Sequence, residues 1–140
     1  MTGSKKGKIY SDGGARGNPG PAAIGVLVCD EKDQKLGDHG EVIGETTNNV
    51  AEYTAVIRGL TLAAELGLEE ADYFLDSELV ARQLSGIYKI KAEHLKPLFT
   101  AVKEKEKKFK RISYFHVPRE HEKIKHVDRL VNIALNRAGH

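Results

Sequence analysis

The order of apolar and polar segments constrains the fold of this chain more than any single motif does. Three strand-like segments follow one another through short polar turns, and helical and strand-like segments alternate after residue 46. The pattern predicts strands over 8–12, 22–29, 35–45, 73–76 and 111–118, and helices over 50–66, 77–84, 92–109 and 127–135. Strands joined by short turns pair antiparallel, whereas a helical crossover leaves two strands parallel. The sequence therefore predicts an α/β fold with a mixed five-stranded sheet, three antiparallel strands first and parallel ones later, flanked by about four helices.

A glycine-rich stretch follows the first expected strand. From Ser11 it reads Ser-Asp-Gly-Gly-Ala-Arg-Gly-Asn-Pro-Gly-Pro, so Asp12 stands directly before a run of small, turn-forming residues. Glycines permit tight turns and the close approach of a large partner. A carboxylate beside such a loop suits a hard metal ion held against a polyanion. An ordinary strand-to-turn transition, with Asp12 as a turn residue, accounts for the same pattern.

Three further acidic residues stand where expected elements begin or end. Glu52 lies in the first turn of the first helix, Asp76 ends the fourth strand, and Asp128 lies near the start of the last helix. Each has a purely structural explanation. Glu52 can cap its own helix together with Asn49. Asp76 can be an N-cap, and Asp128 can interact with the helix dipole. The functional alternative is a shared site, since strand ends are where open α/β sheets bind ligands.

Length, cysteine content and charge limit the classes of function. The 140 residues suffice for one domain, expected over 8–140 after a flexible polar tail at 1–7. A single cysteine, Cys29 in an apolar run, allows no disulfide within the chain and favours a cytoplasmic location. No segment has the length and apolarity of a membrane span or a signal peptide, so no membrane partner is expected. With a net charge of only +2, a nucleic acid would have to be bound by local clusters.

Four sequence blocks occur in a fixed order along the chain. They are Ser11 to Ala23, Thr-Asn-Asn-Val-Ala-Glu-Tyr ending at Tyr53, Asp-Ser-Glu-Leu-Val from Asp76, and Val-Pro-Arg-Glu-His ending at His121 followed by Asp-Arg-Leu-Val-Asn from Asp128. Together they resemble ribonuclease HI, the type 1 ribonuclease H family, in its compact bacterial and archaeal form. The resemblance covers nearly everything from Lys8 to Ala138 and implies a ribonuclease H-like fold.

The resemblance implies an Mg²⁺-dependent endonuclease, a hydrolase that cuts the RNA strand of RNA–DNA hybrids and leaves 5′-phosphate and 3′-hydroxyl ends. The family's catalytic, metal-binding carboxylates match Asp12, Glu52, Asp76 and Asp128. Two Mg²⁺ ions, replaceable by Mn²⁺, are expected among them with substrate, because Mg²⁺ prefers carboxylate, water and phosphate oxygens. Four acids that repel one another have a reason to meet only around metal. His121 matches the mobile histidine that assists the family's reaction as proton carrier or in product release.

The resemblance also implies how the hybrid is recognised. An RNA strand is distinguished from DNA by its 2′-hydroxyls across the minor groove. Asn18, Asn48 and Asn49 match family positions that contact them, and amides suit hydroxyls because they both donate and accept. Turn and helix-cap roles explain the same asparagines. Thr47 matches the DNA-phosphate pocket, and Gly13 is expected to let the substrate approach closely.

Many relatives carry a basic, tryptophan-rich protrusion after the second helix. This chain contains no tryptophan and passes from Gly86 quickly into the next helix. Tyr88, Lys89 and Lys91 are expected to take over part of the protrusion's role by stacking and phosphate contact.

Three other functions are compatible with the motifs. One is a nuclease of this fold that also cleaves double-stranded RNA. Another is a hybrid-binding module without catalysis, for which one of the acids should have been replaced. The last is a transposase- or resolvase-like nuclease, which would leave the asparagines unexplained. The expected protein is a monomer without an obligate protein partner.

Overall fold

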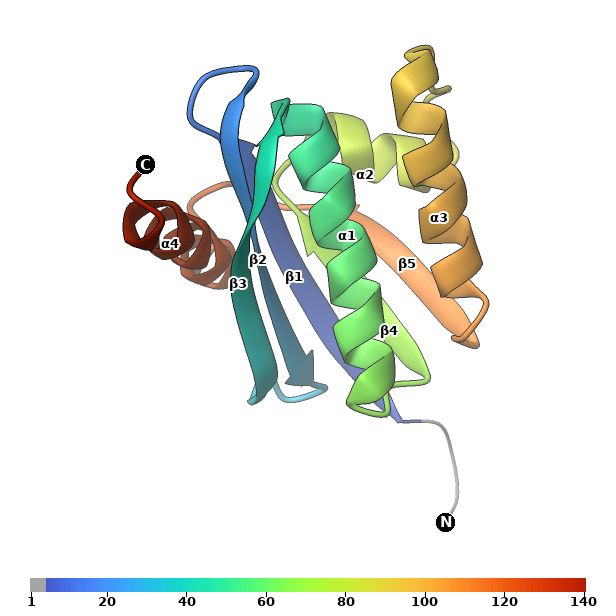
Figure 1. The fold of residues 1–140 in the computed structure, drawn as a ribbon. Coiled ribbons are helices and arrows are strands. Elements are labelled where there is room, and N and C mark those ends of the chain that lie inside the picture. The colour runs from blue at the N-terminus through green and yellow to red at the C-terminus, as the bar shows by residue number, and fades with distance from the viewer. Residues whose placement is uncertain (1–4) are drawn as a thin grey trace.

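A mixed sheet of five strands organises the chain (Figure 1). The computed structural model describes residues 5–140. Its strands are β1 (Lys6–Ala15), β2 (Gly20–Asp30), β3 (Lys35–Thr46), β4 (Glu70–Leu75) and β5 (Arg111–His116). Their order across the sheet is β3-β2-β1-β4-β5; β1, β2 and β3 pair antiparallel, and β4 and β5 continue parallel to β1. The predicted arrangement of three antiparallel strands followed by parallel ones is confirmed.

Helices cover both faces of this sheet. They are α1 (Asn48–Glu65), α2 (Glu78–Leu84), α3 (Lys96–Glu106), which follows a single 3₁₀ turn η1 (Glu93–Leu95), and α4 (Glu122–Arg137). α1, α2 and α3 lie on one side, and α4 lies alone on the other (Figure 1). Between α2 and α3 the chain forms only the short connection containing η1, so no helical protrusion stands there.

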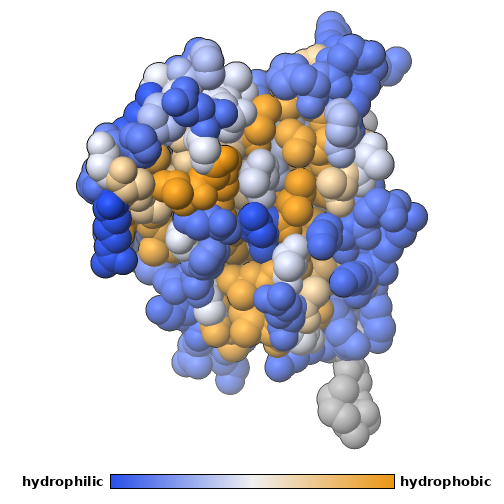
Figure 2. Space-filling model, in the orientation of Figure 1, coloured by the Kyte–Doolittle hydropathy of each residue, from blue (hydrophilic) through white to orange (hydrophobic). Residues whose placement is uncertain are grey.

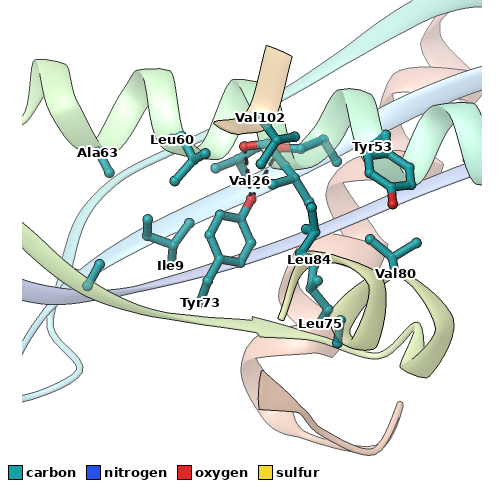
Figure 3. Close-up of a cluster of buried hydrophobic side chains, with 14 of the residues drawn as sticks. Ile9, Val26, Tyr53, Leu60, Ala63, Tyr73, Leu75, Val80, Leu84 and Val102 are labelled. Atoms are coloured by element: carbon teal, nitrogen blue, oxygen red, sulfur yellow. Dashed lines mark hydrogen bonds between the residues drawn. The ribbon is translucent and has the colours of Figure 1, made fainter. Parts of the chain in front are cut away.

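Successive side chains of β1, the central strand, point to opposite faces of the sheet and contribute to a hydrophobic cluster on each face. Ile9 faces α1 and joins the larger cluster, which includes Tyr53, Tyr73 and Val102 (Figure 3). The Tyr73 hydroxyl lies 2.8 Å from Ser11 Oγ and 3.3 Å from the carbonyl oxygen of Ala55, so this buried polar group is satisfied. Tyr10, the next residue of β1, faces α4 and packs with a second cluster. The buried residues of that cluster are Tyr10, Leu27, Cys29, Ile124 and Val127.

Several boundaries differ from those predicted. Residues 1–4 of the expected tail lie outside the described part of the chain, and Lys6 already belongs to β1. β1 runs on through the glycines to Ala15, because the backbone of β2 pairs with it that far regardless of side chain. Asp12 therefore lies inside a strand and not at its end. The predicted helix over 92–109 is interrupted, since η1 precedes α3. The last helix begins at Glu122, five residues before the predicted start, so Asp128 lies in its second turn.

Hydrophilic residues gather on the side of the molecule where α3 lies, on the right of Figure 2. Two ion pairs link residues of this helix and its C-cap to one another: Lys103 with Glu106 at 3.2 Å and Lys107 with Glu104 at 2.8 Å. Glu104 and Lys107 are exposed, whereas Lys103 and Glu106 are half-buried: Lys103 also donates to the Leu84 carbonyl, and Glu106 also accepts from the Tyr114 hydroxyl. None of the described helices combines the length and apolarity that crossing a membrane requires.

Candidate active site

The sheet register brings the first and third acids side by side. β4 runs parallel to β1 with Tyr10 opposite Phe74, so the positions two residues further along are Asp12 and Asp76. β4 ends at Leu75, and β1 therefore has a free edge beside its residues 12–15. Asp76, whose side chain is 14% exposed, comes from the end of β4 into this opening. Ser77, not Asp76, caps α2, so the structural alternative for Asp76 is wrong.

Glu52 reaches the same opening from α1. Its Oε1 accepts a hydrogen bond of 2.8 Å from the Gly13 N–H, which the end of β4 leaves without a strand partner. The structural alternative for Glu52, a helix-capping role, is wrong, because Thr47 is the N-cap of α1 and its Oγ1 accepts from the Val50 N–H. α1 packs so closely against β1 that a β-carbon at Gly13 would lie 2.2 Å from the carbonyl oxygen of Ala51. Gly13 thus makes room for the helix that delivers Glu52.

Carboxylate oxygens of Asp12, Glu52 and Asp76 all lie within 4.8 Å of one another. Asp128 lies outside this group of three, on α4, but it lines the same cleft of about 440 Å³. It is close enough to Asp12 to contribute to the raised pKa of that residue. The structure thus brings together four acids that are separated by up to 116 positions in the sequence, from 12 to 128.

Burial and mutual repulsion disfavour the charged forms of these acids. Burial, with the nearby charges of Asp76 and Asp128, raises the pKa of Asp12 to about 7. Burial, with the charges of Asp12 and Asp76, also raises the pKa of Glu52 well above its ordinary value, although the Gly13 N–H opposes this. A divalent cation would relieve this repulsion.

The donor set fits a hard divalent ion. Each of the three clustered residues offers a carboxylate oxygen, the ligand that Mg²⁺, Mn²⁺ and Ca²⁺ accept, and the group contains no sulfur or imidazole. The cleft is open, so water and a phosphate group could complete the coordination. These residues could therefore hold a metal ion between protein and a bound polyanion.

The predicted asparagines tie the turn after β1 to the start of α1. The Ala15 N–H donates to Asn48 Oδ1 at 2.9 Å, and the Asn48 N–H donates to Asn18 Oδ1 at 3.0 Å. Asn48 and Asn49 line the cleft, as does Gly13. Thr47 is adjacent as the helix cap. The structural roles of Asn18 and Asn48 are thus real, and both residues remain exposed.

Three predicted residues lie elsewhere in the described part of the chain. His121 is the N-cap of α4: its Nδ1 accepts from the Lys123 N–H at 3.1 Å, and its ring lies 5.5 Å from that of Tyr10. It does not line the acidic cleft. Tyr88 and Lys89 are exposed in the connection before η1, with the Arg82 guanidinium 5.7 Å from the Tyr88 ring. Neither lines the cleft.

The cleft also contains polar residues to which the sequence analysis gave no role. Arg119 Nε lies 3.7 Å from Asp76 Oδ2, and Arg16 Nη2 donates to Asn132 Oδ1 at 3.1 Å. All three stand inside the recognised blocks. Asn132 is also four residues after Asp128, a spacing that places both on one helix face. That spacing was the available signal.

The fold and the cleft together define the class of protein: an α/β protein with a mixed five-stranded sheet and a cluster of acidic residues in a cleft beside the end of β4. A family model described as reverse transcriptase-like matches residues 10–134. "Ribonuclease HI" of Halobacterium salinarum is 37% identical over 129 residues, which are 92% of this chain and 64% of that protein. "Bifunctional protein Rv2228c" of Mycobacterium tuberculosis is 42% identical over 132 residues, which are 94% of this chain and 36% of that protein.

A solved structure agrees with these relatives. The crystal structure of LC11-RNase H1 in complex with RNA/DNA hybrid is 42% identical, with a TM-score of 0.89, over 96% of this chain and 99% of that one. The chain belongs to the ribonuclease H family and is similar to its ribonuclease HI members. It spans only about a third of the mycobacterial relative's length.

Proposed function

We propose that this chain is a metal-dependent endoribonuclease that hydrolyses the RNA strand of RNA–DNA hybrids and leaves 5′-phosphate and 3′-hydroxyl ends. The observation that carries the proposal is the convergence of Asp12, Glu52 and Asp76 within 4.8 Å in an open cleft that Asp128 also lines. Burial of like charges is costly without a counter-ion, so this arrangement supports a site built for divalent cations. A cytoplasmic location and a monomeric state, expected from the sequence, belong to the same proposal.

The metal in this proposal is Mg²⁺, two ions with substrate, and Mn²⁺ is a possible replacement. The four acids would hold the ions, which when bound neutralise charge at the scissile phosphate and promote ionisation of water. The chain's own contribution is to fix the acids: the Gly13 N–H holds Glu52, the backbone of β1 holds Asp12, and Asp76 directly follows the last residue of β4. Arg119, exposed beside Asp76, is placed to contact a phosphate that enters the cleft.

The substrate in this proposal is a hybrid duplex. LC11-RNase H1, similar over nearly its whole chain, has been crystallised with one. Asn48 and Asn49 at the cleft, with Asn18 bonded to Asn48, offer amides beside the acids, which supports contacts to 2′-hydroxyls. Thr47 for DNA phosphate, Tyr88 and Lys89 for the outer duplex and His121 as an assisting residue rest on the sequence resemblance.

One assay tests this function. Labelled RNA–DNA hybrid, double-stranded RNA, double-stranded DNA and single-stranded RNA are incubated with the protein in Mg²⁺, in Mn²⁺ and in chelator. The proposal expects internal cuts in the RNA of the hybrid, with 5′-phosphate ends, in metal only. Equal cleavage of double-stranded RNA would extend the substrate range, because the short connection between α2 and α3 leaves the binding surface open. Hybrid binding without cleavage in either metal would establish the non-catalytic module instead.

A further inference from the structure

Asp128 is held differently from the other three acids. Glu52 is buried and accepts a backbone hydrogen bond, and Asp12 and Asp76 extend from the sheet. Asp128 is exposed on α4, and its carboxylate lies outside the group of three. An exposed aspartate samples several rotamers unless a neighbouring group selects one. A metal site that needs Asp128 therefore needs something to hold its side chain.

Two groups contact Asp128: the Asp12 carboxyl, and Asn132 one helical turn later on α4. Asn132 Nδ2 lies 3.4 Å from Asp128 Oδ2 and 3.1 Å from the Asp128 carbonyl oxygen. On its other side, Asn132 Oδ1 accepts a hydrogen bond of 3.1 Å from Arg16. A guanidinium only donates, so Arg16 determines which end of the amide faces it. The NH₂ group of Asn132 is thereby directed toward the Asp128 carboxylate.

Arg16 is itself fixed from the far side of the cleft. It stands in the turn between β1 and β2, next to Ala15, whose N–H donates to Asn48 on α1. Its own N–H donates to the Pro21 carbonyl at 2.8 Å across that turn. Contacts therefore run from α1 through the turn to α4. Asp128 is linked by them to the segment that carries Asn18.

We propose that Asn132 is a positioning residue for Asp128, and that Arg16 holds Asn132 in the orientation this requires. The chain of contacts Arg16–Asn132–Asp128 selects the Asp128 rotamer that adds a fourth carboxylate to the cleft. This inference rests on the proposed function, because it concerns a divalent ion shared among the four acids.

If Asn132 only stabilised the helix, its replacement would affect only the stability of the protein and leave metal binding unchanged. A hydrogen bond between side chains four apart stabilises a helix only slightly, and alanine is the best helix former at an exposed position. Asn132→Ala should therefore leave the melting temperature unchanged or slightly raised. A positioning role requires that the same variant bind metal less well. Stability and metal binding thus separate the two roles.

The test begins with metal binding in the absence of nucleic acid. Mn²⁺ and Mg²⁺ are titrated calorimetrically into the full chain and into variants. Asn132→Ala should raise the half-saturating ion concentration about three- to tenfold, less than most groups outside the first coordination shell, because the contact is long and exposed. Arg16→Ala should act in the same direction, and Arg16→Lys, which keeps a donor, should restore part of the loss. Asn136→Ala, an exposed asparagine four residues further along α4, should match the wild type.

Cleavage and a double-mutant cycle complete the test. Asn132→Ala should need more Mg²⁺ for half-maximal hybrid cleavage, with the KM for hybrid at saturating Mg²⁺ unchanged. In an Asp128→Asn background, Asn132→Ala should change ion binding no further. The positioning role is overturned if a wild type that binds ions and cleaves is matched by Asn132→Ala in ion dependence, or if the loss persists in the Asp128→Asn background. A wild type that neither binds ions nor cleaves overturns the proposed function as well.

Discussion

A β-carbon at Gly13 would lie 2.2 Å from the carbonyl oxygen of Ala51, whereas one at Gly14 would meet nothing within 4 Å. Both glycines are in β1, and neither has a positive φ. We predict that Gly13→Ala pushes α1 away from β1, lowers stability by about 2 kcal/mol or more and impairs cleavage by displacing Glu52. Gly14→Ala should keep both within experimental error. Urea unfolding and hybrid cleavage measure the pair, and equal behaviour of the two variants would contradict the close packing.

The raised pKa of Asp12 makes the stability of the metal-free protein depend on pH. Burial and neighbouring acids raise it from 3.8 to about 7, so the fold favours the protonated form. The stability gained from that proton is complete below the ordinary pKa and is lost as pH rises through about 7. Asn at position 12 is neutral throughout. In chelator, Asp12→Asn should therefore exceed the wild type by on the order of 2 kcal/mol at about pH 8.5.

The difference should shrink strongly at about pH 5, where Asp12 is largely protonated in the fold. Thermal unfolding at the two pH values measures it. Added Mg²⁺ should reverse the order at the higher pH by stabilising only the wild type. If the difference in stability between Asp12→Asn and the wild type did not depend on pH, the raised pKa of Asp12 would be contradicted.

The identities of the acids could be predicted from sequence, but their contacts could not. Glu52 and Asn49 have the spacing of a cap, and only the packing of α1 on Gly13 shows that Glu52 serves a strand amide instead. The spacing of Asp128 and Asn132 places both residues on one helix face, but the contact of Asn132 with Arg16 spans 116 positions and no local pattern predicts it.

At the scale of elements, α4 positions Asp128 by lying almost on the backbone of the sheet. A β-carbon at Gly25, which pairs with Asp12, would lie 2.4 Å from the Val127 carbonyl oxygen, and one at Gly40 would lie 3.1 Å from that of Leu130. We predict that Gly25→Ala displaces α4, costs about 2 kcal/mol or more and reduces cleavage, because Asp128 moves with the helix. Gly40→Ala should do the same more weakly. Urea unfolding and single-turnover cleavage check this order, which the reverse ranking would contradict.

The sequence predicted the last helix, α4, but not the residue at which it begins. The spacing of Val127, Leu130, Val131 and Ala134 predicted the helix, whereas residues 122–125 contribute only Ile124 to its buried face. The N-cap, His121, is not among the residues that commonly cap helices. The contact of the His121 ring with Tyr10 and the packing of Ile124 in the core favour the earlier start of the helix. Both are tertiary contacts, so the local sequence does not predict them.

For the whole molecule, the net charge is only +2, and the cleft that Asp12, Glu52, Asp76 and Asp128 line is acidic. Affinity for a polyanion must therefore come from exposed cations around the cleft. Lys89 and Lys91 are exposed in the connection that replaces the protrusion. We predict that their double substitution by alanine weakens hybrid binding and reduces the slope of log affinity against log salt by about 1 to 2. Turnover at saturating hybrid should be unchanged.

The matched control is Lys32→Ala with Lys108→Ala, which removes the same charge from the connections β2–β3 and α3–β5. Both connections lie away from the turn between β1 and β2 (Figure 1). An equal loss for both pairs would show that net charge alone attracts the hybrid. No loss for either pair would contradict a role for the connection.

The overall topology was the most predictable feature, because the order of segments and the lengths of their connections decide which strands pair. The same topology makes the central claim testable as a whole: four acids, from β1, α1, the end of β4 and α4, act on one phosphate through shared metal.

The most direct measurement is single-turnover cleavage of a labelled hybrid by Asp12→Asn, Glu52→Gln, Asp76→Asn and Asp128→Asn, with hybrid binding measured in parallel. The account predicts that each substitution slows cleavage at least about a hundredfold while binding stays near that of the wild type. Wild-type cleavage by any one of the four variants would contradict it.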